Sequence, residues 1–237
     1  MIVNLGYIAL LLALICSLYS IVSARVYINT NRLQWVDSAR NAVIAVWFLL
    51  TLACLILVYL LTNEHFEIEY VASVSSRAMP WYLKVTALWG GQAGSLLFWS
   101  WLMSSYTGIM MLRDWSKERD MQPYIITASM LTLAFFVSLN VFVENPFNVL
   151  WIDSSGNITS SMMRPDAHFM FTPKDGTGLN PLLRHPGMII HPPMLYLGFV
   201  GFVIPYSFAI GALAVGRTDG VWIRATRRWT LIAWLFL

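Results

Sequence analysis

The chain has 237 residues, of which 58% are hydrophobic and 11% are charged, and its formal net charge is +3. This composition is too apolar for a water-soluble domain of this length, so it indicates an integral membrane protein. The basic residues do not gather into a nucleic-acid-binding face, and we expect no nucleic-acid partner.

Apolar runs long enough to cross a bilayer, which takes about 20 residues, recur along the chain. They cover residues 3–23, 41–62, 86–112, 124–143 and 193–215. A sixth run begins near Trp229 and reaches Leu237, which corresponds to about 13 Å of helix against a hydrocarbon core of about 30 Å. The sequence therefore predicts an all-α, polytopic transmembrane helix bundle with five complete spans and the start of a sixth. We expect a chain of this form to be a fragment or the product of a split gene.

The basic residues predict the orientation of this bundle. With the N-terminus outside the cytoplasm, the cytoplasmic loops carry ten of the fifteen lysines and arginines and the opposite side carries five. Cytoplasmic loops of membrane proteins are enriched in basic residues. We therefore place the N-terminus and the long loop of residues 144–192 on the extracytoplasmic side. The four histidines then lie on that same side: His65, His168, His185 and His191.

The third apolar run is rich in glycine and tryptophan. Gly90, Gly91 and Gly94 leave one helix face nearly bare, and Trp89 and Trp99 are among three tryptophans within thirteen residues. One interpretation is a seam at which helices pack closely in lipid, with ordinary lipid-facing tryptophans. The other is a surface that admits a flat ligand such as a porphyrin. The residues alone leave both open.

His191 is the most informative residue of the chain. It stands where the polar loop ends and the run of residues 193–215 begins, and Pro192 and Pro193 follow it. Since proline is favoured in the first turn of a helix, we predict that a membrane helix begins here, with His191 at its mouth. The positive end of the helix favours the neutral imidazole, which is the form that binds a metal or haem iron. The alternative is an interfacial histidine that is simply solvated.

Several neighbouring residues are weaker candidates for the same site. Tyr196 follows His191 by about one turn, and either lines the same cavity or packs in the core. Arg184 either pairs with the propionates of a haem or is an ordinary solvated loop charge. His185 is predicted to be a loop residue and not a ligand. The second ring nitrogen of His191 needs a partner, for which a backbone carbonyl of the loop or Asp175 is available.

Four stretches together form a recognisable pattern: residues 76–99, 145–147, 175–198 and 216–237. In these stretches the chain resembles the CcmF family of haem-handling membrane proteins of cytochrome c maturation. The resemblance extends over nearly the whole length of the chain. In that family the histidine of the His-Pro-Pro motif is one of two extracytoplasmic axial ligands beside a tryptophan-rich haem-binding surface. The resemblance implies that His191 is such a ligand.

The resemblance implies a function for the whole chain. Residues 1–237 would be the N-terminal portion of one haem-handling domain in the bacterial inner membrane, with residues 144–192 leading to the His-Pro-Pro motif. It would be part of the haem lyase that presents haem, b-type or in transit, to apocytochrome c. The implied partners are a haem chaperone, apocytochrome c, other maturation subunits, the remainder of a CcmF-like protein and the lipid bilayer.

The family's tryptophan-rich segment, its second extracytoplasmic histidine and its two membrane-embedded histidines have no counterpart in these 237 residues. We therefore expect this segment alone not to be catalytic. Two alternatives stay open: a transporter with the glycine-rich run as its gate, and a structural subunit of a split haem lyase. The lack of a charged residue in the middle of a span argues against an ion-coupled transporter.

Overall fold

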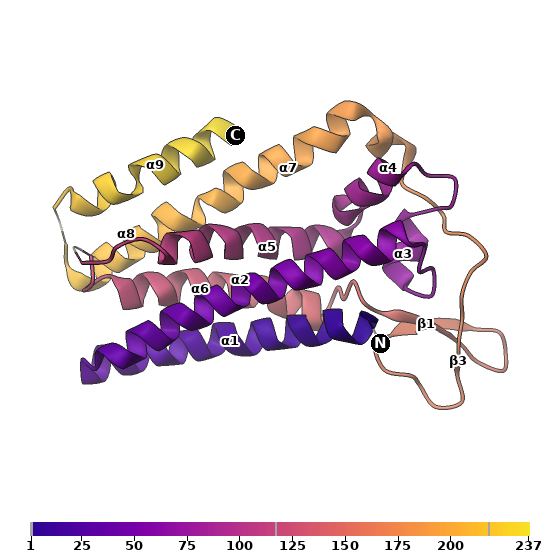
Figure 1. Ribbon diagram of the computed structural model, residues 1–237, viewed down its shortest axis with the longest axis horizontal. Helices are drawn as coiled ribbons and strands as arrows, with labels where there is room; N and C mark the ends of the chain where they lie inside the picture. The colour runs from indigo at the N-terminus through magenta and orange to yellow at the C-terminus, as the bar shows by residue number, and fades with distance from the viewer. Residues whose placement is uncertain (1, 117, 218) are drawn as a thin grey trace.

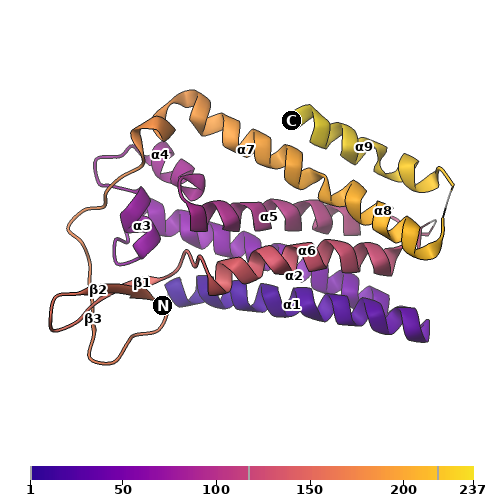
Figure 2. The same ribbon diagram turned by 180° about the vertical axis from the view of Figure 1, so that it is seen from behind.

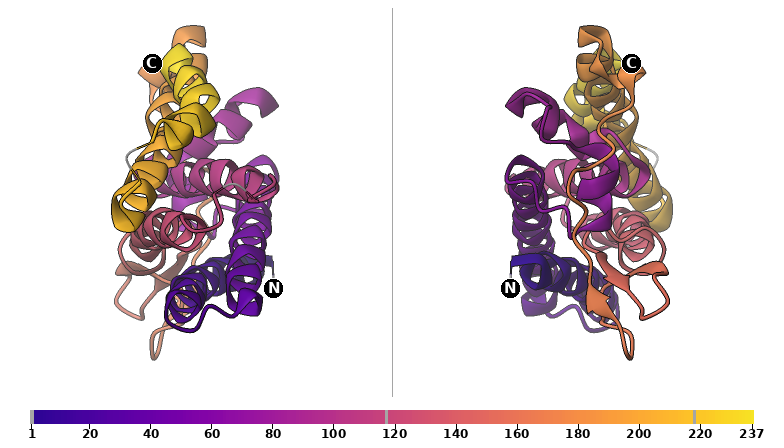
Figure 3. Two further views of the ribbon diagram at one scale, coloured as in Figure 1. Left: turned by 90° about the vertical axis from the view of Figure 1, so that its left-hand side faces the viewer. Right: turned by 90° about the vertical axis from the view of Figure 1, so that its right-hand side faces the viewer.

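The structure, a computed structural model, describes residues 2–116, 118–217 and 219–237. Long helices run side by side along one axis, and Figure 1 shows them in three tiers that Figure 3 views end on. The first tier holds α1 and α2, the second α5 and α6, and the third α7 and α9, while α8 continues α7 obliquely toward α6. In chain order these helices are α1 (Ile2–Thr30), α2 (Leu33–Thr62), α5 (Gln92–Met111), α6 (Gln122–Phe142), α7 (Pro186–Gly201), α8 (Val203–Val215) and α9 (Val221–Phe236).

Small residues let α1 and α2 pack closely. Ser20 and Ser23 are buried on α1. The Ser20 hydroxyl donates to the carbonyl of Ala39 at 3.0 Å, and the Ser23 hydroxyl donates to that of Trp35 at 2.9 Å. In lipid, small side chains and interhelical hydrogen bonds hold helices together because the hydrophobic effect does not. α6 lies between α1 and α8, as Figure 2 shows, and so connects the tiers.

The predicted spans are present as helices. Among the described residues, four helical stretches are long and apolar enough to cross a membrane: Ile2–Thr30, Leu33–Thr62, Gln122–Phe142 and Pro186–Val215. The chain is therefore a helical membrane protein. The last stretch is interrupted at Phe202, between α7 and α8. The remaining predicted span corresponds to α5, which is less apolar and contacts α2, α6, α7 and α8 in the middle of the bundle.

The sequence predicted one continuous helix from residue 86 through the glycine-rich run, but the structure has a break there. The short helix α4 (Trp81–Thr86) passes into the single 3-10 turn η1 (Ala87–Trp89), and α5 begins only at Gln92 after an extended Gly91. Glycine is a poor helix former. The pair Gly90–Gly91 therefore ends one helical segment before the next begins.

The loop of residues 144–192 contains a small antiparallel sheet, so the all-α prediction is wrong in this region. Its strands are β1 (Val149–Ile152), β2 (Ile158–Ser161) and β3 (Phe169–Met170), in the order β2-β1-β3. Trp151 pairs with Thr159 on one side and with Met170 on the other. An isolated bridge from Val149 to Ile68 joins the sheet to the loop that follows α2. The strands are too short to leave a periodic signal in the sequence.

A second set of short elements lies at the same end of the bundle as this sheet. α3 (Glu69–Val74) and α4 lie there, as does the 3-10 helix η2 (Pro181–Arg184). Lys84 of α4 is buried and its ammonium donates to a Glu64 carboxylate oxygen at 2.7 Å. This pair fixes α4 to the end of α2.

The sixth helix begins earlier than predicted. α9 starts at Val221, eight residues before Trp229. It packs closely against α7 at two glycines of α7. A Cβ on Gly198 would lie 2.7 Å from the Leu237 side chain, and one on Gly201 would lie 3.1 Å from the Ala233 side chain.

Candidate functional site

The helix that carries His191 begins before the predicted start of the run of residues 193–215. α7 starts at Pro186, and the His185 ring accepts a hydrogen bond from the Gly187 amide at 3.1 Å. Pro186 therefore occupies the first-turn position that we assigned to Pro192 and Pro193, which lie inside the helix. His185, predicted as an ordinary loop residue, is the N-cap. The signal for this role was the proline directly after it.

His191 lies on an exposed face of α7, in its second turn. Met188, Met194 and Leu195 are on the same side of the helix, and each is between 37% and 39% exposed. Among the described residues, none hydrogen-bonds to the His191 ring. Asp175, one of the predicted partners for that ring, uses its carboxylate elsewhere. The imidazole is therefore exposed on an apolar surface and has no hydrogen-bond partner among the described residues.

The predicted aromatic residues do come together, between α5 and α7. The ring centroid of Trp99 lies 5.2 Å from that of Tyr196, which in turn lies 6.1 Å from Phe98. Trp89 is 5.3 Å from Phe98 and so joins the same cluster. Most of these contacts are edge to face, the arrangement favoured by aromatic quadrupoles. Phe98 and Phe199, which the sequence did not single out, complete the cluster.

Tyr196 and His191 do not face the same way. Five residues along an α-helix correspond to a rotation of about 140°, so Tyr196 is turned toward α5 while His191 is on the open side. The expectation that both line one cavity is therefore wrong. A groove of about 290 Å³ adjoins the aromatic cluster and is lined by Trp99, Met103, Phe136, Phe199 and Tyr206 among others. The Trp99 indole nitrogen is buried without an acceptor in the described part of the chain.

The bare glycine face is filled from within the protein. The Tyr70 ring of α3 covers Gly91 and Gly94, and its hydroxyl donates to the carbonyl of Ala87 at 2.8 Å. A Cβ on Gly90 would collide with the Leu179 side chain. In the structure this glycine face is closely packed from within the chain, as the packing interpretation of the segment expects. Tyr70 lies about twenty residues away in sequence and gave no signal.

Backbone hydrogen bonds connect the long loop to the segment after α3. The Asp175 carboxylate accepts from the Arg77 amide at 2.9 Å and from the Gly176 amide at 2.8 Å. The Thr177 amide donates to the Ala72 carbonyl at 2.8 Å. The Arg77 amide, above all, lowers the pKa of Asp175. These bonds position the chain that leads into η2 and α7.

Arg184 stands at the end of η2, just before α7. Its Nε donates to the Leu179 carbonyl at 2.9 Å, and the residue is otherwise exposed. The guanidinium is therefore held in place with donors still directed outward. It lies within two turns of His191 along the chain.

The other two histidines have polar partners. The His65 ring bonds to Glu67 at 2.8 Å, and the His168 ring bonds to the Asp166 carbonyl at 2.7 Å. Within the described residues, no three His, Cys, Asp or Glu side chains gather into a metal-binding group. An exposed imidazole beside an apolar surface fits a haem better than a bare metal ion, because the porphyrin itself supplies most of the iron ligands.

Comparisons with known proteins identify the family of the chain. The profile of the family described as "Cytochrome C assembly protein" matches residues 89–237. "Cytochrome c-type biogenesis protein CcmF" of Pseudomonas aeruginosa is 35% identical over all of this chain and 33% of its own length. The Escherichia coli protein of the same name is 37% identical over 78% of this chain and 26% of its own length.

A solved structure shares the fold. "Cytochrome c Heme Lyase CcmF" superimposes with a TM-score of 0.78 at 24% identity, covering 100% of this chain and 34% of that one. The chain thus spans about a third of the length of the relatives that it matches.

Proposed function

Because the chain belongs to the cytochrome c assembly protein family, we propose that it handles haem during cytochrome c maturation, as part of a haem lyase. His191 supplies one axial ligand to the haem iron. The observation that carries this proposal is the exposed imidazole of His191, which has no hydrogen-bond partner among the described residues, on an apolar face of α7.

The residues around His191 have separate roles in this proposal. Met188, Met194 and Leu195 offer the apolar surface against which one face of the porphyrin lies. Arg184, held by the Leu179 carbonyl, pairs with a propionate. Trp89, Trp99 and Tyr196 support α7 from behind through the aromatic cluster and do not touch the ligand. When bound, haem supplies the vinyl groups at which thioether bonds to apocytochrome c form.

The chemistry asked of this segment is positioning. Holding a ligand in one orientation removes translational and rotational freedom before reaction, which by itself accelerates a bond-forming step. His191 fixes the iron and the α7 surface fixes the ring plane. The second axial ligand would come from the remainder of a CcmF-like protein, the partner that the resemblance implies.

We further propose a topology in which α5 is a fifth span and the long loop lies outside the cytoplasm. This places residues 144–192, the N-terminus and His191 at the extracytoplasmic surface of the bacterial inner membrane. A haem chaperone and apocytochrome c are then the partners on that side, with other maturation subunits in the membrane. Residues 1–237 act as one portion of a single haem-handling domain.

The test is the absorbance spectrum of haem bound to the complete assembly that contains this chain. His191→Ala is expected to remove most of the Soret absorbance or shift it, because one axial ligand is lost. Added imidazole should restore the wild-type spectrum by occupying the vacated position. His168→Ala is the matched control, because His168 lies in the same loop region with its ring bonded to a carbonyl. A spectrum unchanged by His191→Ala would overturn the proposal.

A further inference from the structure

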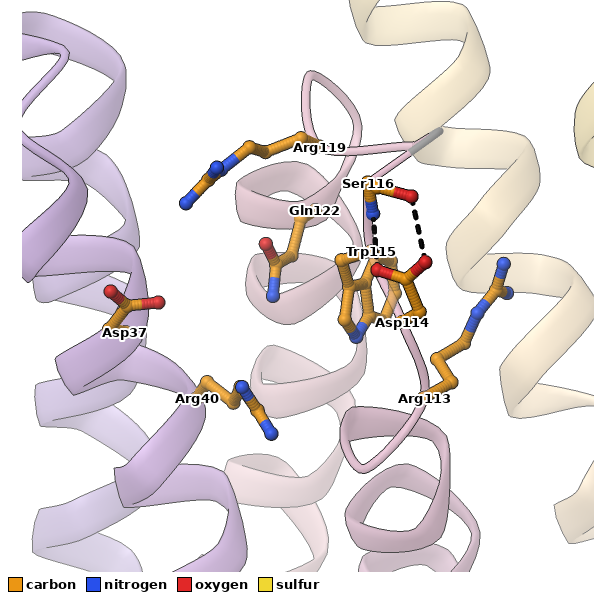
Figure 4. A pocket seen from close by; sticks show the side chains of 8 residues that line it. All are labelled: Asp37, Arg40, Arg113, Asp114, Trp115, Ser116, Arg119 and Gln122. Carbon is orange, nitrogen blue, oxygen red and sulfur yellow. Dashed lines mark hydrogen bonds between the residues drawn. The ribbon is translucent and has the colours of Figure 1, made fainter.

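A polar cavity lies at the end of the bundle opposite to His191 and the sheet. We refer to it as the basal cavity; its volume is about 280 Å³. α2 contributes Asp37 and Arg40, and the connection from α5 to α6 contributes the other side, as Figure 4 shows. The residues that line it are Asp37, Arg40, Arg113, Asp114, Trp115, Ser116, Arg119 and Gln122.

Two hydrogen-bond donors at this cavity have no acceptor. The Nε of Arg40 and the Nε1 of Trp115 are both buried, and neither finds a partner in the described part of the chain. The Trp115 side chain is only 7% exposed. A buried donor without an acceptor costs about 1–3 kcal/mol, so two at one cavity indicate a missing acceptor.

The Trp115 indole cannot turn to find another acceptor. Its ring stacks on Phe208 at 5.9 Å, with an angle of 18° between the planes. The Arg113 guanidinium lies 5.1 Å from the centre of the same ring and is itself bonded to Glu118 at 2.7 Å. The direction of the indole N–H is therefore set by the packing around it.

The charges that line the cavity leave a surplus of unpaired donors. The Asp114 carboxylate accepts from the amide and the hydroxyl of Ser116. Arg113 is paired with Glu118, which among the described residues leaves Arg40 and Arg119 as the cations that line the cavity. Asp37 precedes Arg40 by one turn on α2 and is exposed. Arg40 and Trp115 both line the cavity, so one acceptor placed in it could serve both donors.

The level of the cavity in the membrane points to the kind of acceptor. Arg40 is the last charged residue before the apolar run of residues 41–62, so it stands where the hydrocarbon core meets the headgroup region. Basic pockets at this level bind lipid headgroups. Arginine is the side chain best matched to phosphate, because its planar fork presents several donors to the oxygens.

We propose that the basal cavity binds a phosphate group, with Arg40 and the Trp115 N–H as its two principal donors. Arg119 contributes the second positive charge. The phosphate belongs to a phospholipid headgroup or is free inorganic phosphate, and the ligand fixes the α5–α6 connection to α2. The site is independent of haem and lies at the other end of the molecule.

The test uses the whole chain purified in dodecyl maltoside in phosphate-free buffer. Native mass spectrometry with added phosphatidylethanolamine or phosphatidylglycerol measures lipid retention, and thermal shift with inorganic phosphate measures the free ion. Saturable binding of either kind supports the site, and the arm that responds identifies the source. Arg40→Gln and Trp115→Phe should each weaken binding by about tenfold or more, since each removes a hydrogen bond to a charged group.

Matched controls separate a specific site from general attraction to a basic surface. Arg32→Gln removes an exposed arginine at the same end of the bundle, and Trp35→Phe changes a nearby tryptophan outside the cavity. Both should bind as the unmodified chain does. Trp115→Phe keeps the aromatic ring, so it reports on the N–H even if Arg40→Gln unfolds. The proposal is overturned if no probe binds, or if Arg40→Gln and Trp115→Phe, once shown to be folded by circular dichroism, weaken binding no more than the controls.

Discussion

The start of α5 and the start of α7 are the two segments that the sequence marks most strongly, and they have opposite surroundings. At α5, the space left by Gly91 and Gly94 is occupied by Tyr70. At α7, the imidazole of His191 is exposed and none of the described residues bonds to it. The glycines of α5 therefore serve packing within the chain, whereas His191 has no packing role and is free for the ligand that we propose.

This difference separates two kinds of effect. Substitutions at the α5 segment should change stability and leave haem ligation to the folded fraction intact. Substitutions at His191 should do the reverse.

Gly94→Ala should destabilise the protein by about 3 kcal/mol, at the upper end of the range for overpacking a tight core. The added Cβ would collide with the Leu88 carbonyl and the Tyr70 hydroxyl, and both are buried. Thermal unfolding in detergent, followed by circular dichroism, measures the change. Gly220→Ala is the control, because a Cβ there meets only the Arg224 side chain at 3.7 Å. Equal melting temperatures for the two variants would contradict the packing interpretation.

Tyr70→Phe should cost about 2 kcal/mol, because the Ala87 carbonyl loses a buried donor while the ring that fills the glycine face remains. Burial raises the pKa of the Tyr70 phenol, so the hydroxyl is a donor at neutral pH. The same unfolding experiment applies, with Tyr82→Phe, whose ring is 49% exposed, as the control. If Tyr70→Phe lost less stability than Tyr82→Phe, the Tyr70 hydroxyl would not stabilise the helix break before α5.

The hydrogen bonds from the Arg77 and Gly176 amides to the Asp175 carboxylate, which attach the long loop, should be lost at acid pH. Since the pKa of Asp175 is lowered in the folded state, its contribution is present above the ordinary carboxyl value of about 4 and is lost as the pH falls through the lowered pKa. Amide NMR signals of Arg77 and Gly176 in labelled protein should follow this titration. Asp175→Asn should abolish it. A midpoint at or above about 4 contradicts the prediction.

His191→Ala should change the free energy of unfolding by less than about 0.5 kcal/mol in the absence of haem, as is usual for exposed positions. The reason is that none of the described residues hydrogen-bonds to the ring. Thermal unfolding of haem-free protein measures this directly. A large loss of stability would assign His191 a structural role and remove the contrast with Gly94.

The sequence predicted the long helices because their apolar runs are continuous, and α6 begins two residues before the predicted span. It failed where a distant residue decides the local structure. Nothing in residues 86–94 indicates that Tyr70 fills the glycine face, and the sheet depends on pairing between strands of two to four residues. At α7, two sites for a first-turn proline were available. The structure uses Pro186, so His191 lies in the helix and not before it.

For the aromatic cluster, the sequence predicted which residues come together but not the direction in which each side chain faces. The sequence identified Trp89, Trp99 and Tyr196 because tryptophan and tyrosine are conspicuous, and the structure does bring them together. The direction in which each faces depends on where the helix begins and which neighbour it meets. The role of His191 as a ligand stays a prediction until its spectrum is measured.

The two prolines after His191 also affect how α7 can bend. Neither Pro192 nor Pro193 has an N–H, so the carbonyls of Met188 and Ile189 receive no hydrogen bond from the next turn. Two successive missing bonds weaken the helix at this turn, and the His191 side chain is attached to it. In the role that we propose, His191 would follow a bound haem through small displacements without disturbing the contacts of Gly198 and Gly201 with α9. Replacing both prolines by alanine would stiffen that turn and leave the histidine in place.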